Sequence, residues 1–146
     1  MKEIKIYTAG KMAGLTYEEQ MNWRYRIQEH IRRRTNHKIT FVHPPMFYTY
    51  DSAYHKTELE VKNWDINQVR DSDIVIVNLD GVNSSVGTHF ELSMVDAINS
   101  FGNKHIYLIG VGESNEALHP WIECSLHRHE KDFADAAEYI CEYLLV

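Results

Sequence analysis

This chain of 146 residues has few cysteines and prolines and no net positive charge. It contains two cysteines, Cys124 and Cys141, and three prolines. Two cysteines outside any paired framework exclude a disulfide-stabilised scaffold and indicate a reducing compartment. With a formal net charge of −6, the chain lacks the basic face that binds nucleic acid polymers or anionic membranes. The net charge does not exclude binding of a small anionic ligand, because a local pocket can be positive in an acidic protein.

Long apolar runs are missing as well. No stretch approaches the roughly 20 apolar residues of a transmembrane helix, and residues 1–10 lack the apolar centre of a signal peptide. We therefore expect a cytoplasmic protein. A content of 44% hydrophobic and 25% charged residues is typical of a globular fold. The length, without repeats or linkers, predicts one domain over 1–146.

Strand-like and helix-like segments alternate along the chain. Apolar runs predict strands over 3–10, 37–45, 73–79 and 104–112, and a weaker fifth strand over 121–128. Helical spacing of apolar residues predicts helices over 16–34, 57–72, 85–102 and 131–146, the first with a capping box of Thr16 and Glu19. The run 73–79 has no polar alternation, as expected of a central parallel strand. The pattern predicts an α/β, doubly wound sandwich.

In such folds, ligands bind beyond the carboxyl ends of the strands. Loops at that edge are expected at 9–15, 43–56, 80–88 and 110–120. The first loop holds Gly10 and Lys11, and Lys11 could meet a phosphate, although the dinucleotide fingerprint and the Walker lysine spacing are absent. The second loop is rich in aromatics, including Tyr48. Such rings either pack on the core or stack on a flat ligand such as a nucleobase.

The third loop leads into VNSSVGTHFEL, which places Glu91 inside a predicted helix. Thr88 and Glu91 have the spacing of a capping box, so Glu91 could simply stabilise the helix start. The other interpretation is chemical. Ser84, Ser85 and Gly87 offer hydroxyls and amides at a helix N-terminus, a cradle for an anion or a sugar. A carboxylate beside that cradle could attack a sugar carbon. The local pattern leaves both interpretations open.

A C-x-x-H-x-H cluster occurs near the C-terminus, formed by Cys124, His127 and His129. A structural zinc site usually needs a fourth ligand at clear spacing. We therefore favour ordinary side chains at a strand edge and expect no metal.

Three pieces of the sequence, KIYTAGKMAG, WDINQVRDSDIVIVNLDG and SSVGTHFELSMVDA, together resemble the nucleoside 2-deoxyribosyltransferase family. That family includes the 2′-deoxynucleoside 5′-phosphate N-hydrolases. The resemblance runs from Lys5 to about Ile109 in order and spacing, and the C-terminal third matches poorly. It implies a flavodoxin-like fold with a parallel five-stranded sheet, no cofactor, and a homodimer or larger homo-oligomer. It also implies cleavage of the N-glycosidic bond of a nucleoside or nucleotide.

The resemblance further implies roles for individual residues. Glu91 matches the nucleophile that forms a glycosyl-enzyme, later passed to water or another base. Tyr7 matches a tyrosine that hydrogen-bonds that glutamate, and Asp65 matches an aspartate that helps handle the leaving base. Ser85 stands where typical transferases have an aspartate for the sugar 5′-hydroxyl, and where the phosphate-hydrolysing branch has a serine. This departure favours nucleoside 5′-monophosphates. The alternative is a catalytically silent nucleotide-binding module.

Overall fold

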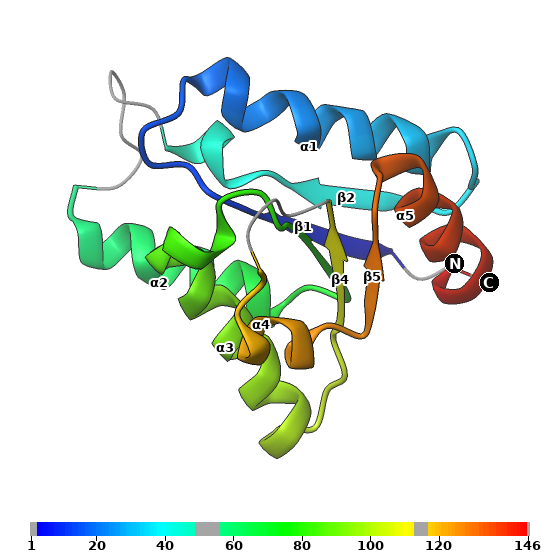
Figure 1. Ribbon diagram of the computed structural model, residues 1–146. Coiled ribbons are helices and arrows are strands. Elements are labelled where there is room, and N and C mark those ends of the chain that lie inside the picture. Colours follow the sequence, from blue (N-terminus) through cyan, green and yellow to red (C-terminus); the bar gives the residue numbers. More distant parts are fainter. Residues whose placement is uncertain (1–2, 49–55, 113–116, 146) are drawn as a thin grey trace.

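The computed structural model describes residues 3–48, 56–112 and 117–145 (Figure 1). Its centre is a five-stranded sheet in the order β2-β1-β3-β4-β5, with every neighbouring pair parallel. The strands are β1 (Ile4–Ala9), β2 (Ile39–Val42), β3 (Ile74–Asn78), β4 (Tyr107–Val111) and β5 (Arg128–Glu130). The predicted doubly wound α/β sandwich is confirmed, and the strand order is the flavodoxin-like one.

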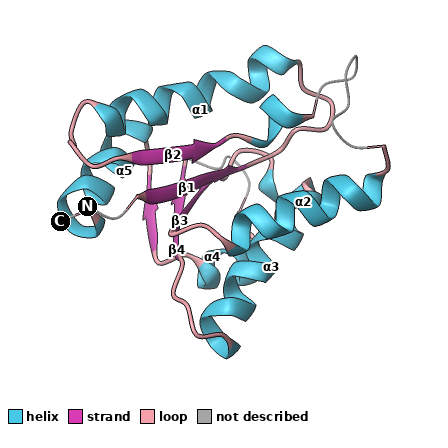
Figure 2. Ribbon diagram, turned by 180° about the vertical axis from the view of Figure 1, so that it is seen from behind, coloured by secondary structure: helices cyan, strands magenta, loops and turns pink. Residues whose placement is uncertain are grey.

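Helices cover both faces of the sheet, as Figures 1 and 2 show from opposite sides. One face carries α1 (Tyr17–Arg32) and α5 (Phe133–Tyr139), and the other carries α2 (Glu58–Arg70), α3 (Val86–Phe101) and α4 (Pro120–Ser125). None of these helices is both long and apolar enough to span a membrane.

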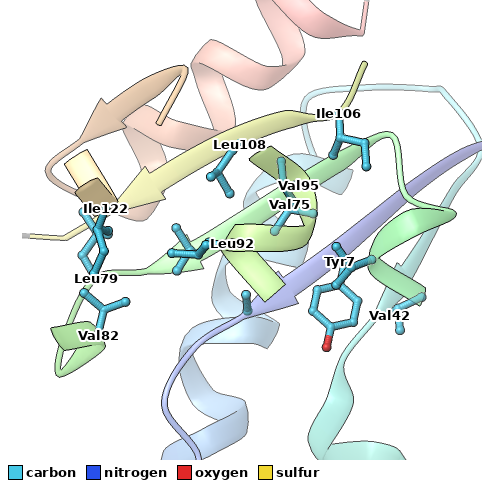
Figure 3. Packing of buried hydrophobic residues seen from close by; sticks show 13 residues of the cluster. Tyr7, Val42, Val75, Leu79, Val82, Leu92, Val95, Ile106, Leu108 and Ile122 are labelled. Atoms are coloured by element: carbon cyan, nitrogen blue, oxygen red, sulfur yellow. The ribbon is translucent and has the colours of Figure 1, made fainter. Parts of the chain in front are cut away.

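The sheet is buried on both faces because its central strand is apolar throughout. In β3, Ile74 and Ile76 join the core cluster under α1 and α5, whereas Val75 and Val77 join the cluster under α2 and α3 (Figure 3). Successive side chains of a strand point to opposite faces. A run of β-branched residues without polar alternation therefore suits a strand paired on both sides.

The first helix begins as its sequence predicts. Thr16 is its N-cap, and the Thr16 hydroxyl accepts a hydrogen bond from the Glu19 amide while the Glu19 carboxylate accepts one from the Thr16 amide. This capping box is worth about 1 kcal/mol at the N-cap alone. It fixes where the chain turns from the carboxyl end of β1 into α1.

Two predictions for the C-terminal third were wrong. The segment 121–128 is mostly the helix α4, because Pro120 suits a first helical position and the His119 ring accepts a hydrogen bond from the Trp121 amide. The strand is only the short β5 that follows. The last helix is also not one α-helix over 131–146, since α5 ends at Tyr139 and the chain continues as a π-helical turn over Ile140–Leu144.

The chain leaves β1 and β3 toward opposite faces of the sheet, to α1 and to α3 respectively. Adjacent strands whose connections diverge in this way leave a crevice at their carboxyl ends, where α/β proteins bind ligands. Loop residues 10–16, 43–48 and 79–85 lie at this edge. Residues 49–55 and 113–116, which complete the predicted second and fourth loops, lie outside the described residues.

Candidate active site

Glu91 lies in the second turn of α3, with its side chain 8% exposed. The N-cap of this helix is Ser85, and Thr88 is already inside the helix, with its hydroxyl 2.7 Å from Ser85 Oγ. The capping role considered for Glu91 is therefore wrong, because a carboxylate so far into the helix cannot reach the free amides of its first turn. In the described part of the chain, Glu91 is the only buried carboxyl group.

The partner that faces Glu91 comes from β1. Tyr7 is fully buried in the cluster between the sheet and α3, with its hydroxyl at the outer end of the ring (Figure 3). Tyr7 Oη and Glu91 Oε2 are both buried without a hydrogen bond of normal geometry, although the two groups are close enough to influence each other's ionisation. A buried polar atom left unpaired costs about 1–3 kcal/mol. Such atoms at a ligand-binding edge suit contact with a ligand.

The ionisation of Glu91 is strongly perturbed. Burial raises the pKa of Glu91 to about 8, the Tyr7 hydroxyl lowers it, the nearby Asp65 raises it and Arg24 lowers it. Burial also raises the pKa of Tyr7 well above its usual value, and Glu91 and Asp65 add to that rise. Tyr7 is therefore a neutral hydroxyl donor at every physiological pH.

Asp65, on α2, is the second carboxyl group of the site. It is half-buried, and burial raises the pKa of Asp65 to about 6, against a lowering influence of Arg24. Asp65 loses its proton at a lower pH than Glu91. The negative charge of Asp65 therefore raises the pKa of Glu91, whereas Glu91 is still neutral when Asp65 ionises. Between about pH 6 and pH 8 the two groups therefore hold one proton between them. The structure thus brings together Glu91, Tyr7 and Asp65 from three separate elements.

Sequence reasoning missed a buried arginine at this site. Arg24, on α1, donates through Nε–H to Thr8 Oγ1 (3.2 Å) and to the Thr8 carbonyl (3.4 Å), and through Nη2–H to the Gly10 carbonyl (3.4 Å). Its Nη1–H donates to the Gln20 carbonyl. A signal was present, since residues 20, 24, 27 and 31 form the buried stripe of the helix. A charge on that stripe could have been noticed.

His43 continues the same network and was also missed. Its Nδ1 lies 2.7 Å from Thr8 Oγ1, and its Nε2 lies 2.7 Å from Gln28 Oε1. Burial, with smaller contributions from the charges of Arg24 and Arg32, lowers the pKa of His43 to about 4. The ring is therefore neutral at physiological pH, and the network carries a single positive charge, on Arg24.

The predicted residues of the first loop have different surroundings. A Cβ at Gly10 would lie 2.9 Å from Trp23 Cζ2, so this glycine is required where α1 packs closely on the end of β1. The side chain of Lys11 reaches Gly81, where a Cβ would lie 3.0 Å from Lys11 Cδ. Lys11 is therefore brought to the loop between β3 and α3.

The start of α3 holds the other predicted binding residues. The exposed Ser84 hydroxyl donates to the Gly81 carbonyl (3.2 Å), and Ser85 contacts Thr88 as described above. A Cβ at Gly87 would meet nothing within 4 Å, so open space lies beside the first turn. Ser84, Ser85 and Gly87 thus lie at the N-terminus of α3, and Lys11 lies beside Gly81 in the loop that leads to it.

Tyr48 is placed elsewhere on the rim. Its hydroxyl donates to Glu58 Oε1 at 3.2 Å, which ties it to the first turn of α2. The preceding ring, Phe47, packs on Trp64 with 4.6 Å between ring centroids. Because Trp64 directly precedes Asp65 in α2, the ring of Phe47 packs on the helix next to one of the two carboxyl groups of the site. Tyr50 and Tyr54 lie outside the described residues.

The side chains of the C-x-x-H-x-H cluster do not converge on one point. His127 Nδ1 accepts a hydrogen bond from the Leu108 amide (2.9 Å), and His129 Nε2 lies 2.9 Å from the Gly112 carbonyl. Over residues 3–48, 56–112 and 117–145, no three His, Cys, Asp or Glu side chains are grouped so that they could hold a metal ion.

A cavity of about 520 Å³ lies between α3 and α4, lined among others by His89, Asp96, Trp121 and Cys124. Neither Tyr7, Asp65 nor Glu91 lines it. Residues 89 and 96 are on a different side of α3 from Glu91, which faces the sheet. We place the candidate site at Glu91, because the perturbed titratable groups and the unpaired buried atoms meet there.

The burial of Glu91 predicts an unusual dependence of stability on pH. A carboxyl group whose pKa is about 8 when folded and 4.5 in its ordinary state makes folding less favourable as the pH rises between those values. Glu91→Gln keeps the shape and removes the charge. Its free energy of unfolding should be close to that of wild type at pH 5 and larger than that of wild type at pH 9. The gain should be a few kcal/mol, since one unit of pKa corresponds to about 1.4 kcal/mol.

The measurement is denaturant unfolding of both proteins across this range. Glu123→Gln, which removes an exposed carboxylate from α4, is the control and should give no such trend. A constant difference between Glu91→Gln and wild type from pH 5 to pH 9 would contradict a buried, perturbed Glu91.

No protein-family model and no curated protein matches the chain at a significant level. Solved structures do match. A 2-deoxyribosyltransferase from Bacillus psychrosaccharolyticus has a TM-score of 0.68 and 20% identity, covering 97% of this chain and 94% of that one. A 2-desoxiribosyltransferase from Leishmania mexicana has a TM-score of 0.57 and 18% identity, covering 96% and 98%. A conserved protein from Enterococcus faecalis V583 has a TM-score of 0.71 and 15% identity, covering 95% and 98%. Over nearly its whole length, the chain therefore has the fold of 2-deoxyribosyltransferases of known structure.

Proposed function

We propose that residues 1–146 form a nucleoside deoxyribosyltransferase-like domain that cleaves the N-glycosidic bond of a (deoxy)nucleoside or its 5′-monophosphate. One observation carries this proposal. Tyr7 Oη and Glu91 Oε2 are buried without a hydrogen-bond partner among the described residues, beside Asp65 and at the ligand-binding edge of the sheet. The likeness in fold to two 2-deoxyribosyltransferases supports the class of substrate. Fold alone would not, since one fold serves many functions.

The reaction proceeds in two steps. The Glu91 carboxylate attacks the anomeric carbon, the C–N bond breaks, and the base leaves with the bonding electrons and takes a proton supplied through Asp65. The resulting glycosyl-Glu91 ester is then attacked at the anomeric carbon by water, or by a second base. The attacking group gives a proton to Asp65, the bond to Glu91 breaks, and the carboxylate is restored. The chemistry needs one carboxylate and one carboxylic acid. One proton shared by Asp65 and Glu91 near neutral pH meets that need.

Tyr7 holds Glu91 in the orientation for attack. Its hydroxyl stays protonated, so it can donate a hydrogen bond to the carboxylate and stabilise the ionised form. In the free protein the shared proton favours Glu91, whose pKa is the higher of the two. Before the attack, this proton passes to Asp65 or to the base.

The start of α3 supports a 5′-monophosphate as the preferred substrate. A helix N-terminus attracts anions through its free amides and its dipole. Here the first turn is open at Gly87, and Ser84 and Ser85 supply hydroxyls. The ammonium group of Lys11, from the first loop, lies beside Gly81 in the segment that leads into the helix. A phosphate at this place would meet a positive side chain and no carboxylate at position 85.

Exposed apolar residues support a homodimer or larger homo-oligomer. Leu59, Val86 and Phe90 are 64%, 66% and 53% exposed, and lie near the amino-terminal ends of α2 and α3. These ends border the proposed site, so a second copy covering them would close the pocket over the substrate.

A second candidate is a nucleotide-binding module without turnover. It is favoured by the raised pKa of Glu91, because a mostly protonated carboxyl at pH 7 is a poor nucleophile. Base release decides between the two candidates.

The first prediction concerns Glu91 itself. Glu91→Ala should fold and lose base release by several orders of magnitude, because it removes the covalent path. Free base is measured by chromatography after incubation with nucleosides and their 5′-monophosphates, with and without an acceptor base. Release from wild type without an acceptor indicates a hydrolase, and exchange only with an acceptor indicates a transferase. Near-wild-type turnover by Glu91→Ala, or no turnover by wild type, contradicts the proposal.

The shared proton predicts a bell-shaped pH profile. The quantity kcat/KM should be greatest between about pH 6 and pH 8, where Asp65 and Glu91 hold one proton. It should fall about tenfold per pH unit outside that range, since the free enzyme then carries both protons or neither. Asp65→Asn should lose the alkaline limb together with most of the rate. A flat profile through pH 5–9 would exclude the one-proton form as the active species.

Ser85 predicts the choice between nucleoside and monophosphate. An aspartate at this position would set a negative charge against the phosphate, a repulsion of a few kcal/mol at an effective dielectric near 20. Ser85→Asp should therefore lower kcat/KM for the 5′-monophosphate about 100-fold, at 1.4 kcal/mol per tenfold. The value for the unphosphorylated nucleoside should fall less or rise.

The matched control is Ser93→Asp, an exposed position on the same helix outside the site. It should leave the ratio of the two kcat/KM values unchanged. Equal losses on both substrates with Ser85→Asp would mean that residue 85 does not face the 5′ position.

A further inference from the structure

Arg24 and Glu91 are the two buried residues of ordinarily charged type in the described part of the chain. All other Lys, Arg, Asp and Glu side chains described there are at least partly accessible to solvent. A buried charge is costly unless another charge or several hydrogen bonds compensate for it. Each of them therefore needs a compensating interaction.

The hydrogen bonds of Arg24 do not neutralise its charge. Its acceptors are the carbonyls of Thr8, Gly10 and Gln20 and the hydroxyl of Thr8, all of them neutral. The guanidinium also stacks on Trp23, 4.5 Å from the ring centroid. Within the described ranges, no carboxylate lies within ion-pair distance of it. The positive charge is thus held firmly and left unpaired.

The position of this charge is set by alternation along β1. Thr8 points toward α1 and binds Arg24, whereas the preceding residue, Tyr7, points toward α3 and faces Glu91. Figure 1 shows α1 and α3 on opposite sides of the sheet. The guanidinium therefore lies beneath the carboxyl end of β1, and Glu91 lies above it.

The titratable groups that face Arg24 come from four elements. They are Tyr7 of β1, His43 after β2, Asp65 of α2 and Glu91 of α3. His43 is neutral and contributes no charge of its own. Lys11, a cation of the first loop, is directed to Gly81 and is partly exposed to water, which screens it. The buried guanidinium is therefore the dominant fixed positive charge beneath the acidic pair.

We propose that Arg24 is a positioning residue, whose buried charge keeps one negative charge on the Asp65–Glu91 pair while its hydrogen bonds hold the end of β1 that carries Tyr7. The effect of Arg24 on catalysis rests on the proposed function. Its effect on the ionisation of Asp65 and Glu91 does not, because it depends only on where the three side chains lie in the fold. Without Arg24, both carboxyl groups would hold their protons to higher pH, so a smaller share of the pair would carry a negative charge at neutral pH.

Titration of the two carboxyl groups by NMR tests this directly. Protein carrying ¹³C-labelled carboxyl groups is titrated as wild type, Arg24→Gln, Arg24→Lys and Arg26→Gln. The Glu91 and Asp65 signals are assigned by their loss in Glu91→Gln and Asp65→Asn. Arg26 is the matched control, because it lies on the same helix and is exposed.

In Arg24→Gln, both midpoints should rise by about one pH unit, the size expected for loss of a nearby opposite charge. Arg24→Lys keeps the charge and loses the fork of donors, so its midpoints should stay near the wild-type values. Arg26→Gln should leave both midpoints unchanged. The two limbs of kcat/KM should move with the midpoints in each variant.

Unchanged midpoints in folded Arg24→Gln would overturn the proposal, and so would an equal rise in Arg24→Lys and Arg24→Gln. Should Arg24→Gln fail to fold, Arg24→Met, which fills the same space with apolar atoms, takes its place under the same criteria. Since the titration needs no substrate, it decides the role of Arg24 even if wild type releases no base. The latter result would overturn only the proposed function.

Discussion

The end of β1 lies between two buried ionisable side chains, Arg24 and Glu91, which approach it from opposite faces of the sheet. Thr8 and Gly10 accept hydrogen bonds from Arg24 on one side, and Tyr7 faces Glu91 on the other. This arrangement needs a strand that is buried on both faces and ends in a crevice. The flavodoxin-like order provides one, since β1 lies between β2 and β3 and the connections diverge.

Such a site lowers the stability of the fold. Among the residues that the structure describes, the Tyr7 hydroxyl and one Glu91 carboxyl oxygen have no hydrogen-bond partner, and the Arg24 guanidinium has no ion pair, and each of these disfavours folding. The apolar strand β3 and the two core clusters offset this cost, because their β-branched side chains pack on both faces. Buried groups that weaken a fold are typical of functional sites, where a ligand supplies the missing partners.

Fold and chemistry answer different questions about this protein. At 15–20% identity, the solved structures share its fold, and the strand order of that fold places a crevice at the carboxyl ends of the strands. The kind of reaction depends on which side chains stand there. The perturbed pair of Asp65 and Glu91, the neutral Tyr7 and the lysine beside Gly81 are properties of this chain. The proposed glycosidic chemistry rests on these side chains, and the fold alone does not establish it.

The sequence by itself determined the α/β class, the central apolar strand, the capping box at Thr16 and the residues that resemble a nucleophile site. These are local patterns, in which neighbouring residues suffice to predict strand, helix or cap. Tertiary structure alone decided that Glu91 is buried beyond any capping position, that residues 120–125 form a helix, and that Arg24 lies beneath the acidic pair. The reason is that charge and burial act through space. Residues 7, 24, 65 and 91 are far apart in the chain and meet only when α1, α2 and α3 pack on the sheet.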